Sequence, residues 1–124
     1  MFKVMLESGP RIDVVGRKHT IAYANDGSLP NPLEATYAAL AGCAGVYAKK
    51  ACKELGIDDA GIGIELKVVA QPDKPLLPSR IVTHLQFPDR FTVDQKQSVL
   101  ASVDRCAVKA LMQSGEKINF EVNG

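Results

Sequence analysis

Apolar and polar positions alternate along the first part of the chain in the pattern typical of β-strands. The alternation covers residues 2–7, 11–14 and 19–23, and glycines interrupt it between these stretches. A period of two is expected for strands that bury one face of an antiparallel sheet. Residues 25–30, Asn-Asp-Gly-Ser-Leu-Pro, favour a loop. We therefore expect three antiparallel strands followed by a loop.

The next segment predicts a long helix from Pro32 to about Leu55. Asn31 suits the N-cap, Pro32 suits the first turn, and Glu34 completes the spacing of a capping box. Proline is absent from there to Gly56, which is a suitable C-terminal stop. Because apolar residues stand on most faces of this helix, the pattern predicts a helix at the centre of the structure.

The second half of the chain begins with two further alternating stretches, residues 62–68 and 81–87, which could pair as a hairpin. Between them, residues 71–79 hold three prolines and predict a loop. The pair Thr92 and Gln95 has capping-box spacing, and a second helix is expected from there to about Ser114.

Residues 118–122 alternate again and predict a closing strand. The resulting order is β-β-β-α-β-β-α-β. Since few segments resemble parallel crossovers, this order predicts the α+β class with antiparallel sheets. The length of 124 residues fits a single domain over residues 1–124.

Composition and charge exclude several classes of function. The chain has 15 basic and 14 acidic residues, a net charge of +1, which favours neither nucleic acid nor an anionic membrane surface as a partner. The N-terminal residues lack the features of a secretory signal, and the apolar stretch 35–48 is too short to span a bilayer. We therefore expect a cytoplasmic protein.

Three cysteines occur, at positions 43, 52 and 106. An odd number without a secretion signal argues against a structural disulfide framework. No Cys-x-x-Cys motif occurs, and no cysteine and histidine cluster has the spacing of zinc ligands. We therefore expect neither a metal nor another cofactor.

Cys43 lies between Gly42 and Gly45 in the predicted long helix. A glycine inside a helix costs about 1 kcal/mol relative to alanine, so we expect a neighbouring element to pack closely there. The Cys43 thiol is then either a small buried apolar group, the common state of a free cysteine, or a reactive group.

Cys106 lies on the apolar stripe of the second predicted helix, where it could simply pack in the core. If it meets Cys43, a sulfenic acid on one cysteine could be captured by the other as a disulfide. Cys52 lies on nearly the opposite side of the long helix from Cys43, and we interpret it as structural.

A peroxide-reactive thiol must be ionised, which usually requires a cation nearby. The basic residues that could serve are Arg11, Arg17, Arg80, Arg105 and Lys109. Glu34 could hold such an arginine in place, or act only in the helix cap. Apolar residues suited to the entrance of such a site are Leu33, Tyr37, Phe87 and Leu111.

Three segments together resemble the OsmC/Ohr superfamily of osmotically induced and organic hydroperoxide resistance proteins. The run from Asn31 to Cys43 is similar to the family's proline, glutamate, alanine-rich helix and cysteine. The run Val103–Val108 resembles its second-cysteine helix, and Ser79–Leu85 resembles the strand between them. In order and spacing the resemblance covers nearly the whole chain.

This resemblance implies an intertwined homodimer with the long helices packed centrally. It implies reduction of organic hydroperoxides, with Cys43 as the peroxidatic and Cys106 as the resolving cysteine. In such proteins an early-strand arginine, here Arg11 or Arg17, and a glutamate at the start of the long helix, here Glu34, lower the pKa of the first cysteine. A lipoyl-type dithiol then reduces the disulfide.

The sequence departs from the family pattern in ways that indicate a divergent OsmC-like branch. Leu33 stands where the hydroperoxide-resistance branch has its glutamate, and Ala107 stands where a proline often follows the second cysteine. These changes leave open a non-catalytic dimeric stress or ligand-binding protein, or a different thiol chemistry. The sequence alone leaves open which peroxide and which reductant would be used.

Overall fold

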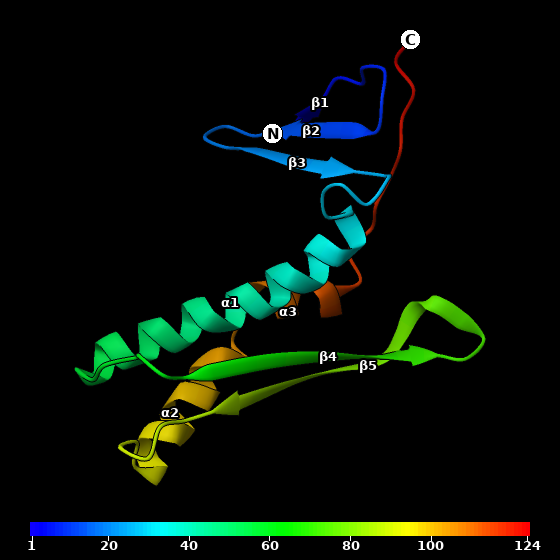
Figure 1. Ribbon diagram of the computed structural model, residues 1–124. Helices are drawn as coiled ribbons and strands as arrows, with labels where there is room; N and C mark the ends of the chain where they lie inside the picture. Colours follow the sequence, from blue (N-terminus) through cyan, green and yellow to red (C-terminus); the bar gives the residue numbers. More distant parts are fainter. The chain divides into compact units, whose positions relative to one another are not determined.

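The alternating residues at the N-terminus form the three-stranded antiparallel sheet that the sequence predicts. Its strands are β1 (Lys3–Val4), β2 (Arg11–Val15) and β3 (Thr20–Ala24), paired in the order β1-β2-β3 (Figure 1). Gly9 adopts a φ of 104° in the turn before β2, a conformation that favours glycine. The glycine-punctuated alternation therefore predicts both the strands and their order.

The computed structural model describes the backbone of residues 1–124 and every side chain except those of Pro75 and Leu76. The chain divides into two units, Met1–Ala38 and Ala39–Gly124. The first contains the three-stranded sheet and the start of the long helix. The second contains the rest of that helix and everything after it.

The long helix α1 spans Pro32–Leu55, which confirms the bounds expected from the sequence. The backbone N–H of Glu34 donates to the Asn31 side-chain oxygen at 2.8 Å, so Asn31 caps the helix. Gly56 ends it with a φ of 69°. The buried residues Ala44, Ala48, Ala51 and Cys52 lie on one side of α1, whereas Val46 on another side is 56% exposed. Within the chain, one apolar face of α1 is therefore covered and another is open.

The predicted hairpin forms from β4 (Gly63–Gln71) and β5 (Lys74–Gln86), which pair antiparallel with Leu66 opposite Thr83 (Figure 1). The expectation of a loop over residues 71–79 is wrong for most of that stretch, because β5 already begins at Lys74. The register shifts between Val69 and Gln71, opposite Pro78. Irregular pairing of this kind accommodates a proline, which cannot donate to the ladder.

The second predicted helix is divided into α2 (Val93–Asp104) and α3 (Ala107–Ser114), so the expectation of one continuous helix is wrong. The capping box of α2 is confirmed, with Thr92 and Gln95 each bonding the other's backbone N–H. The helix stops because the amides of Arg105 and Cys106 bond carbonyls three residues back, a tighter turn than the α-helix. Cys106 follows in an extended conformation, at the N-cap of α3.

The closing strand expected over residues 118–122 is absent from the described chain. Its apolar residues Ile118, Phe120 and Val122 are exposed. A strand forms only where a neighbour satisfies its backbone hydrogen bonds, and this segment pairs with none of the described strands. The predicted α+β class with antiparallel sheets holds without it.

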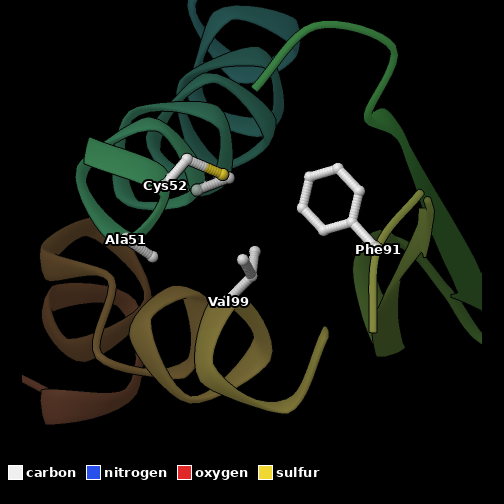
Figure 2. Packing of buried hydrophobic residues seen from close by; sticks show 5 residues of the cluster. Ala51, Cys52, Phe91 and Val99 are labelled. Atoms are coloured by element: carbon white, nitrogen blue, oxygen red, sulfur yellow. The ribbon is translucent and has the colours of Figure 1, made fainter. Parts of the chain in front are cut away.

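The core of the second unit lies between α1, α2 and the β4–β5 hairpin. Figure 2 shows the side chains of Cys52, Val99 and Phe91 converging in it, with Ala51 beside them. Cys52 and Val99 are fully buried. Cys52 is thus a core residue, as its place on the helix predicts, and the core fixes how α2 packs against α1.

Candidate functional site

Cys43 and Cys106 come from different helices but lie next to each other. Cys43 is half-buried in the middle of α1, and Cys106 is buried at the N-cap of α3. The hydroxyl of the buried Ser102, in α2, donates to the carbonyl of Tyr47 in α1 at 3.0 Å. This hydrogen bond holds together the helix turns adjacent to the two cysteines. As a result the two thiols are close enough for each to shift the pKa of the other.

The surroundings of Cys43 favour its thiolate. Burial raises the pKa of Cys43, but hydrogen bonds from the Cys106 thiol and from the backbone amides of Val108 and Ala107 outweigh it. The pKa of the Cys43 thiol therefore lies below its ordinary value. Amides at the start of a helix point their N–H groups outward and are known to stabilise a thiolate. The break between α2 and α3 is what creates this helix start beside Cys43.

The pKa of Cys106 is shifted in the opposite direction, above its ordinary value. Burial is the largest cause that raises the pKa of Cys106, and its hydrogen bond to Cys43 raises it further. The backbone amides of Lys109 and Val108 lower it only partly. Of the two thiols, Cys43 is therefore the one whose thiolate its surroundings favour, and Cys106 donates the hydrogen bond between them.

The two glycines beside Cys43 differ in what surrounds them. A Cβ on Gly45 would lie 3.9 Å from Ile64 Cδ1 of β4, an ordinary contact. A Cβ on Gly42 would meet no atom of the described residues within 4 Å. The described residues therefore do not supply the close packing expected at Gly42. That position lies on the open face of α1 instead.

A pocket of about 530 Å³ opens in the second unit next to the thiol pair. Cys106 lines the pocket, together with Leu40 and Ala44 of α1, which stand on either side of Cys43 in the sequence. The remaining lining residues come from β5, α2 and α3, and most are apolar: Pro78, Arg80, Ile81, Thr83, Leu85, Leu100, Val103, Asp104, Lys109, Met112 and Gln113. An aliphatic group of moderate size fits such a surface.

Two cations and one carboxylate supply most of the polarity of the pocket. Lys109 and Asp104 form an ion pair across the break between α2 and α3. The hydrogen bond and the charge of Lys109 hold the pKa of Asp104 below its usual value. Arg80, on β5, has no carboxylate within ion-pair distance among the described residues. The pocket therefore carries an excess of positive charge.

The other residues expected in the site belong to the first unit. Arg11 lies on β2 and pairs with Asp13 at 3.0 Å, whereas Arg17 is exposed after β2. Glu34 is exposed in the first turn of α1. Within the second unit the thiolate of Cys43 is favoured by a thiol and two amides instead of a cation. The roles of Arg11, Arg17 and Glu34 stay predictions.

Sequence reasoning missed the backbone amides of Ala107 and Val108, because a continuous helix would have used them internally. The dipeptide Arg105-Cys106 gives no proline or glycine signal for the break. Phe87, one of the apolar residues expected at the entrance of the site, does not line the pocket. It packs against Phe91 beside the core. The cations in the pocket, Arg80 and Lys109, were among the residues that the sequence singled out.

No group of three or more His, Cys, Asp or Glu side chains in the described residues is arranged to hold a metal ion. None of the helices in the described part of the chain has both the length and the apolarity needed to cross a membrane.

Comparison with known proteins gives the family. The model of the OsmC-like protein family matches residues 25–121. The chain belongs to the OsmC-like family. This match includes α1 with Cys43 and the segment with Cys106, so both cysteines lie inside the family's common region. No curated protein matches the chain in sequence.

Solved structures show the same fold at low sequence identity. An OsmC-like protein from Mycoplasma pneumoniae aligns with a TM-score of 0.72 and 14% identity, over 93% of this chain and 87% of that one. A Psychrobacter arcticus 273-4 protein, named for an osmotic stress induced and detoxification response, aligns with a TM-score of 0.68 and 18% identity, over 86% and 83%. A third structure, from structural genomics, has a TM-score of 0.72 at 16% identity, over 93% and 90%. At these identities the likeness establishes the OsmC fold.

Proposed function

We propose that this OsmC-like protein is a two-cysteine peroxidase that reduces organic hydroperoxides through Cys43 and Cys106. One observation carries the proposal: the two thiols lie side by side, and their surroundings lower the pKa of one and raise that of the other. A peroxidatic cysteine needs the lower pKa, and a resolving cysteine needs only proximity.

The reaction takes two steps on the protein. The Cys43 thiolate attacks the outer oxygen of the hydroperoxide, the O–O bond breaks, and the alkoxide takes a proton from solvent and leaves as an alcohol. Cys43 is then a sulfenic acid. Cys106 loses its proton and attacks the Cys43 sulfur, so that the S–S bond forms while the S–O bond breaks. The released hydroxide takes a proton and leaves as water.

Apolar groups around Cys43 favour an organic hydroperoxide over hydrogen peroxide. Leu40 and Ala44 flank it on α1 and line the largely apolar pocket. An alkyl group that leaves water for such a surface gains about 0.8 kcal/mol for each buried methylene. Hydrogen peroxide has no alkyl group and gains nothing from these contacts.

We also propose that an arginine of the first unit, Arg11 or Arg17, acts together with Glu34 to favour the Cys43 thiolate. The family resemblance supports the pair, and α1 links Glu34 to Cys43 in one continuous helix. Arg11 would have to leave its ion pair with Asp13, which costs little because both side chains are exposed. Substitution of each arginine by glutamine distinguishes them, because only the one that acts will slow oxidation of Cys43.

The protein is proposed to act as a homodimer. The open face of α1 around Gly42 and Val46 is apolar, and the exposed residues of segment 118–122 alternate without a partner strand. Unpartnered apolar surfaces of this kind are typical of subunit interfaces. We propose that residues 1–124 act as one OsmC-like domain in this dimer, since the family match extends across the boundary between the two units.

A dithiol, such as one of the lipoyl type, is the proposed reductant, and the cytoplasm is the proposed compartment. The three cysteines are free in the structure, which suits a reducing compartment. The cycle also requires a disulfide between Cys43 and Cys106 that forms and is then reduced, so a dithiol must have access to it.

A non-catalytic dimeric stress or ligand-binding protein is the second candidate. It is favoured by the apolar pocket of about 530 Å³ and by the burial of Cys106, which is 2% exposed. In that case the pocket would hold an apolar ligand and the thiols would only pack beside it. Rapid and selective oxidation of Cys43 distinguishes the peroxidase from this alternative.

The test is a single-turnover oxidation of the reduced protein by cumene hydroperoxide and, separately, by hydrogen peroxide. Free thiols are counted in the wild type, Cys43→Ser and Cys106→Ser. We expect rapid loss of two thiols per chain with the organic peroxide, no rapid loss in Cys43→Ser, and a trapped sulfenic acid in Cys106→Ser. Slow loss that neither substitution alters would contradict the peroxidase.

A further inference from the structure

The break between α2 and α3 lacks the usual devices that end one helix and begin the next. The C-cap of α2 is Arg105, with a φ of −88° and a ψ of 12°, so no glycine in the left-handed region closes that helix. The N-cap of α3 is Cys106, whose side chain makes no cap hydrogen bond. Ala107 follows at the first position of α3, where a proline would fix φ and an alanine does not. The turn that carries Cys106 therefore depends on a restraint from other residues.

An ion pair between Asp104 and Lys109 encloses this break. Asp104 is the last residue of α2 and Lys109 lies in the first turn of α3, so that Cys106 stands between the two partners. Lys109 Nζ also donates to the backbone carbonyl of Asp104 at 3.5 Å, and the end of a helix leaves such carbonyls without a helical partner. Among the described residues, no other side-chain hydrogen bond or ion pair joins α2 to α3.

The location of Asp104 indicates that the pair serves the break and not α2 itself. The C-terminal end of a helix carries partial negative charge, which disfavours a carboxylate there. Lys109 offsets this conflict, because its hydrogen bond and its charge hold the pKa of Asp104 below its usual value. Residues placed against the local preference are often found at functional sites.

The exposure of the pair separates its effect on stability from its effect on geometry. The Asp104 side chain is 75% exposed and that of Lys109 is 38% exposed. Ion pairs open to solvent contribute little to the free energy of unfolding. Cys106, by contrast, is buried, and both its amide and its carbonyl are hydrogen-bonded within the restrained turn. A change in the turn therefore moves Cys106 without unfolding the protein.

We propose that Asp104 and Lys109 are positioning residues for disulfide closure, which hold the α2–α3 break in the form that presents Cys106 to Cys43. The proposal deepens the peroxidase cycle and rests on it. The Cys106 thiol must lose its proton and attack the Cys43 sulfur along one direction, and a small misplacement of the attacking atom slows such a step. The pair acts on this step through the geometry of the turn.

A direct effect of the Lys109 charge on the thiols makes the opposite prediction for Asp104. If that charge promoted ionisation of a thiol, removal of Asp104 would release it and closure would become faster. If the pair is a restraint, removal of either partner slows closure. Removal of both partners then slows it no further, because each single change already breaks the same contact.

Closure can be measured without any peroxide, with dithiodipyridine as the oxidant. The Cys43 thiolate attacks one sulfur of the reagent, one thiopyridone leaves, and a mixed disulfide remains on Cys43. Cys106 then loses its proton and attacks the Cys43 sulfur, and the new S–S bond forms as the second thiopyridone leaves. The absorbance of thiopyridone reports both releases. The second is a first-order step that does not depend on the reagent concentration, and Cys106→Ser should abolish it.

Asp104→Asn and Lys109→Met should each slow the second release by about threefold to fivefold, and the double variant should match the single ones. Lys109→Arg keeps the charge and the donors, so it should remain within about twofold of the wild type. Lys49→Met is the matched control, because it removes another exposed ion pair, with Asp59 at 3.1 Å, away from the break. It should close at the wild-type rate.

Urea unfolding completes the test, since all these variants should unfold close to the wild-type midpoint. Faster closure in Asp104→Asn, wild-type closure in Lys109→Met, or additive losses in the double variant would overturn the inference. Slower closure accompanied by a marked loss of stability would also overturn it, because the pair would then support only the fold.

The two proposals can fail separately. If cumene hydroperoxide leaves the thiols unchanged but Asp104→Asn and Lys109→Met slow the second release, the peroxidase is wrong and the positioning role stands. If peroxide removes two thiols rapidly but these variants close at the wild-type rate, the peroxidase stands and this inference is wrong.

Discussion

The Ser102 hydroxyl donates a hydrogen bond of 3.0 Å to the Tyr47 carbonyl, and this bond lies one helical turn from each of the two cysteines of the site. Tyr47 follows Cys43 by one turn of α1, and Ser102 precedes Cys106 by one turn at the end of α2. Because Ser102 is buried, water competes little for this bond. It therefore acts as a positioning contact for the thiol pair.

Substitution of Ser102 by alanine should affect both stability and the chemistry of the site. Loss of the bond should lower the free energy of unfolding by about 1 kcal/mol. It should also slow formation of the Cys43–Cys106 disulfide, because the end of α2 is then held less firmly against α1. Urea unfolding and the rate of disulfide formation with diamide measure the two effects.

Ser98→Ala is the matched control, since Ser98 is exposed one turn earlier on the same helix. It should leave both quantities close to the wild type. If Ser102→Ala lowers stability but disulfide formation keeps its rate, the hydrogen bond supports only the fold and has no positioning role.

The lowered pKa of Cys43 predicts how its reactivity depends on pH. In the folded state its thiolate is favoured, so its rate of alkylation by iodoacetamide should rise and level off at a lower pH than that of an ordinary thiol. By linkage, the same group adds stability above its unfolded-state pKa, and this contribution disappears as the pH falls through the folded-state pKa. Site-resolved alkylation rates from peptide mapping measure the midpoint.

Cys106→Ala supplies a control for the origin of that shift. It removes the thiol that hydrogen-bonds Cys43, so the midpoint for Cys43 should move to higher pH. The amides of Ala107 and Val108 remain in the variant and should retain part of the effect. A midpoint that stays unchanged in Cys106→Ala would mean that the neighbouring thiol contributes nothing to the ionisation of Cys43.

The third cysteine gives a prediction about the core. Cys52 is fully buried among apolar side chains, and burial raises its pKa, so it should remain protonated and unreactive. Cys52→Ser would bury a hydroxyl there and should lower the free energy of unfolding by about 1–3 kcal/mol. Cys52→Ala should cost less, because it only leaves a small cavity. Urea unfolding should therefore rank the wild type first, Cys52→Ala second and Cys52→Ser last.

Both variants should still lose two thiols per chain on oxidation by cumene hydroperoxide, because Cys43 and Cys106 are unchanged. Loss of that oxidation in a folded Cys52→Ala variant would place Cys52 in the redox chemistry and would contradict its structural role.

The features that the sequence predicted correctly are those encoded by neighbouring residues. Asn31, Pro32 and Gly56 define the ends of α1 through local backbone chemistry, and Thr92 with Gln95 defines the start of α2. The alternating strands are encoded in the same local way. These signals act within one turn of a helix or a few residues of a strand, so they can be read without knowledge of the tertiary structure.

The features that the sequence did not predict depend on contacts between distant segments. The contact between Cys43 and Cys106 requires α2 to pack on α1, which the core and the Ser102–Tyr47 bond determine. The break before α3 follows from two backbone hydrogen bonds at Arg105 and Cys106, and no helix-breaking residue marks it. Segment 118–122 has a strand pattern but needs a partner edge, and none of the described strands pairs with it.

The open face of α1 gives the last prediction, which tests the homodimer. Gly42 has no described atom within 4 Å of its Cβ position, and Val46 beside it on the helix surface is 56% exposed. If two copies pack through this face, Gly42→Leu should weaken the dimer, because the added side chain would occupy space needed by the partner helix. In the monomer the same change should raise helix stability by about 1 kcal/mol, so a loss of dimer would not be due to unfolding.

Sedimentation velocity measures the dimer and circular dichroism measures the stability of the helix. Ala101→Leu, on the exposed surface of α2, controls for added apolar bulk. A Gly42→Leu protein that sediments as the wild-type dimer would exclude this face as the interface, and a wild type that sediments as a monomer would contradict the homodimer itself.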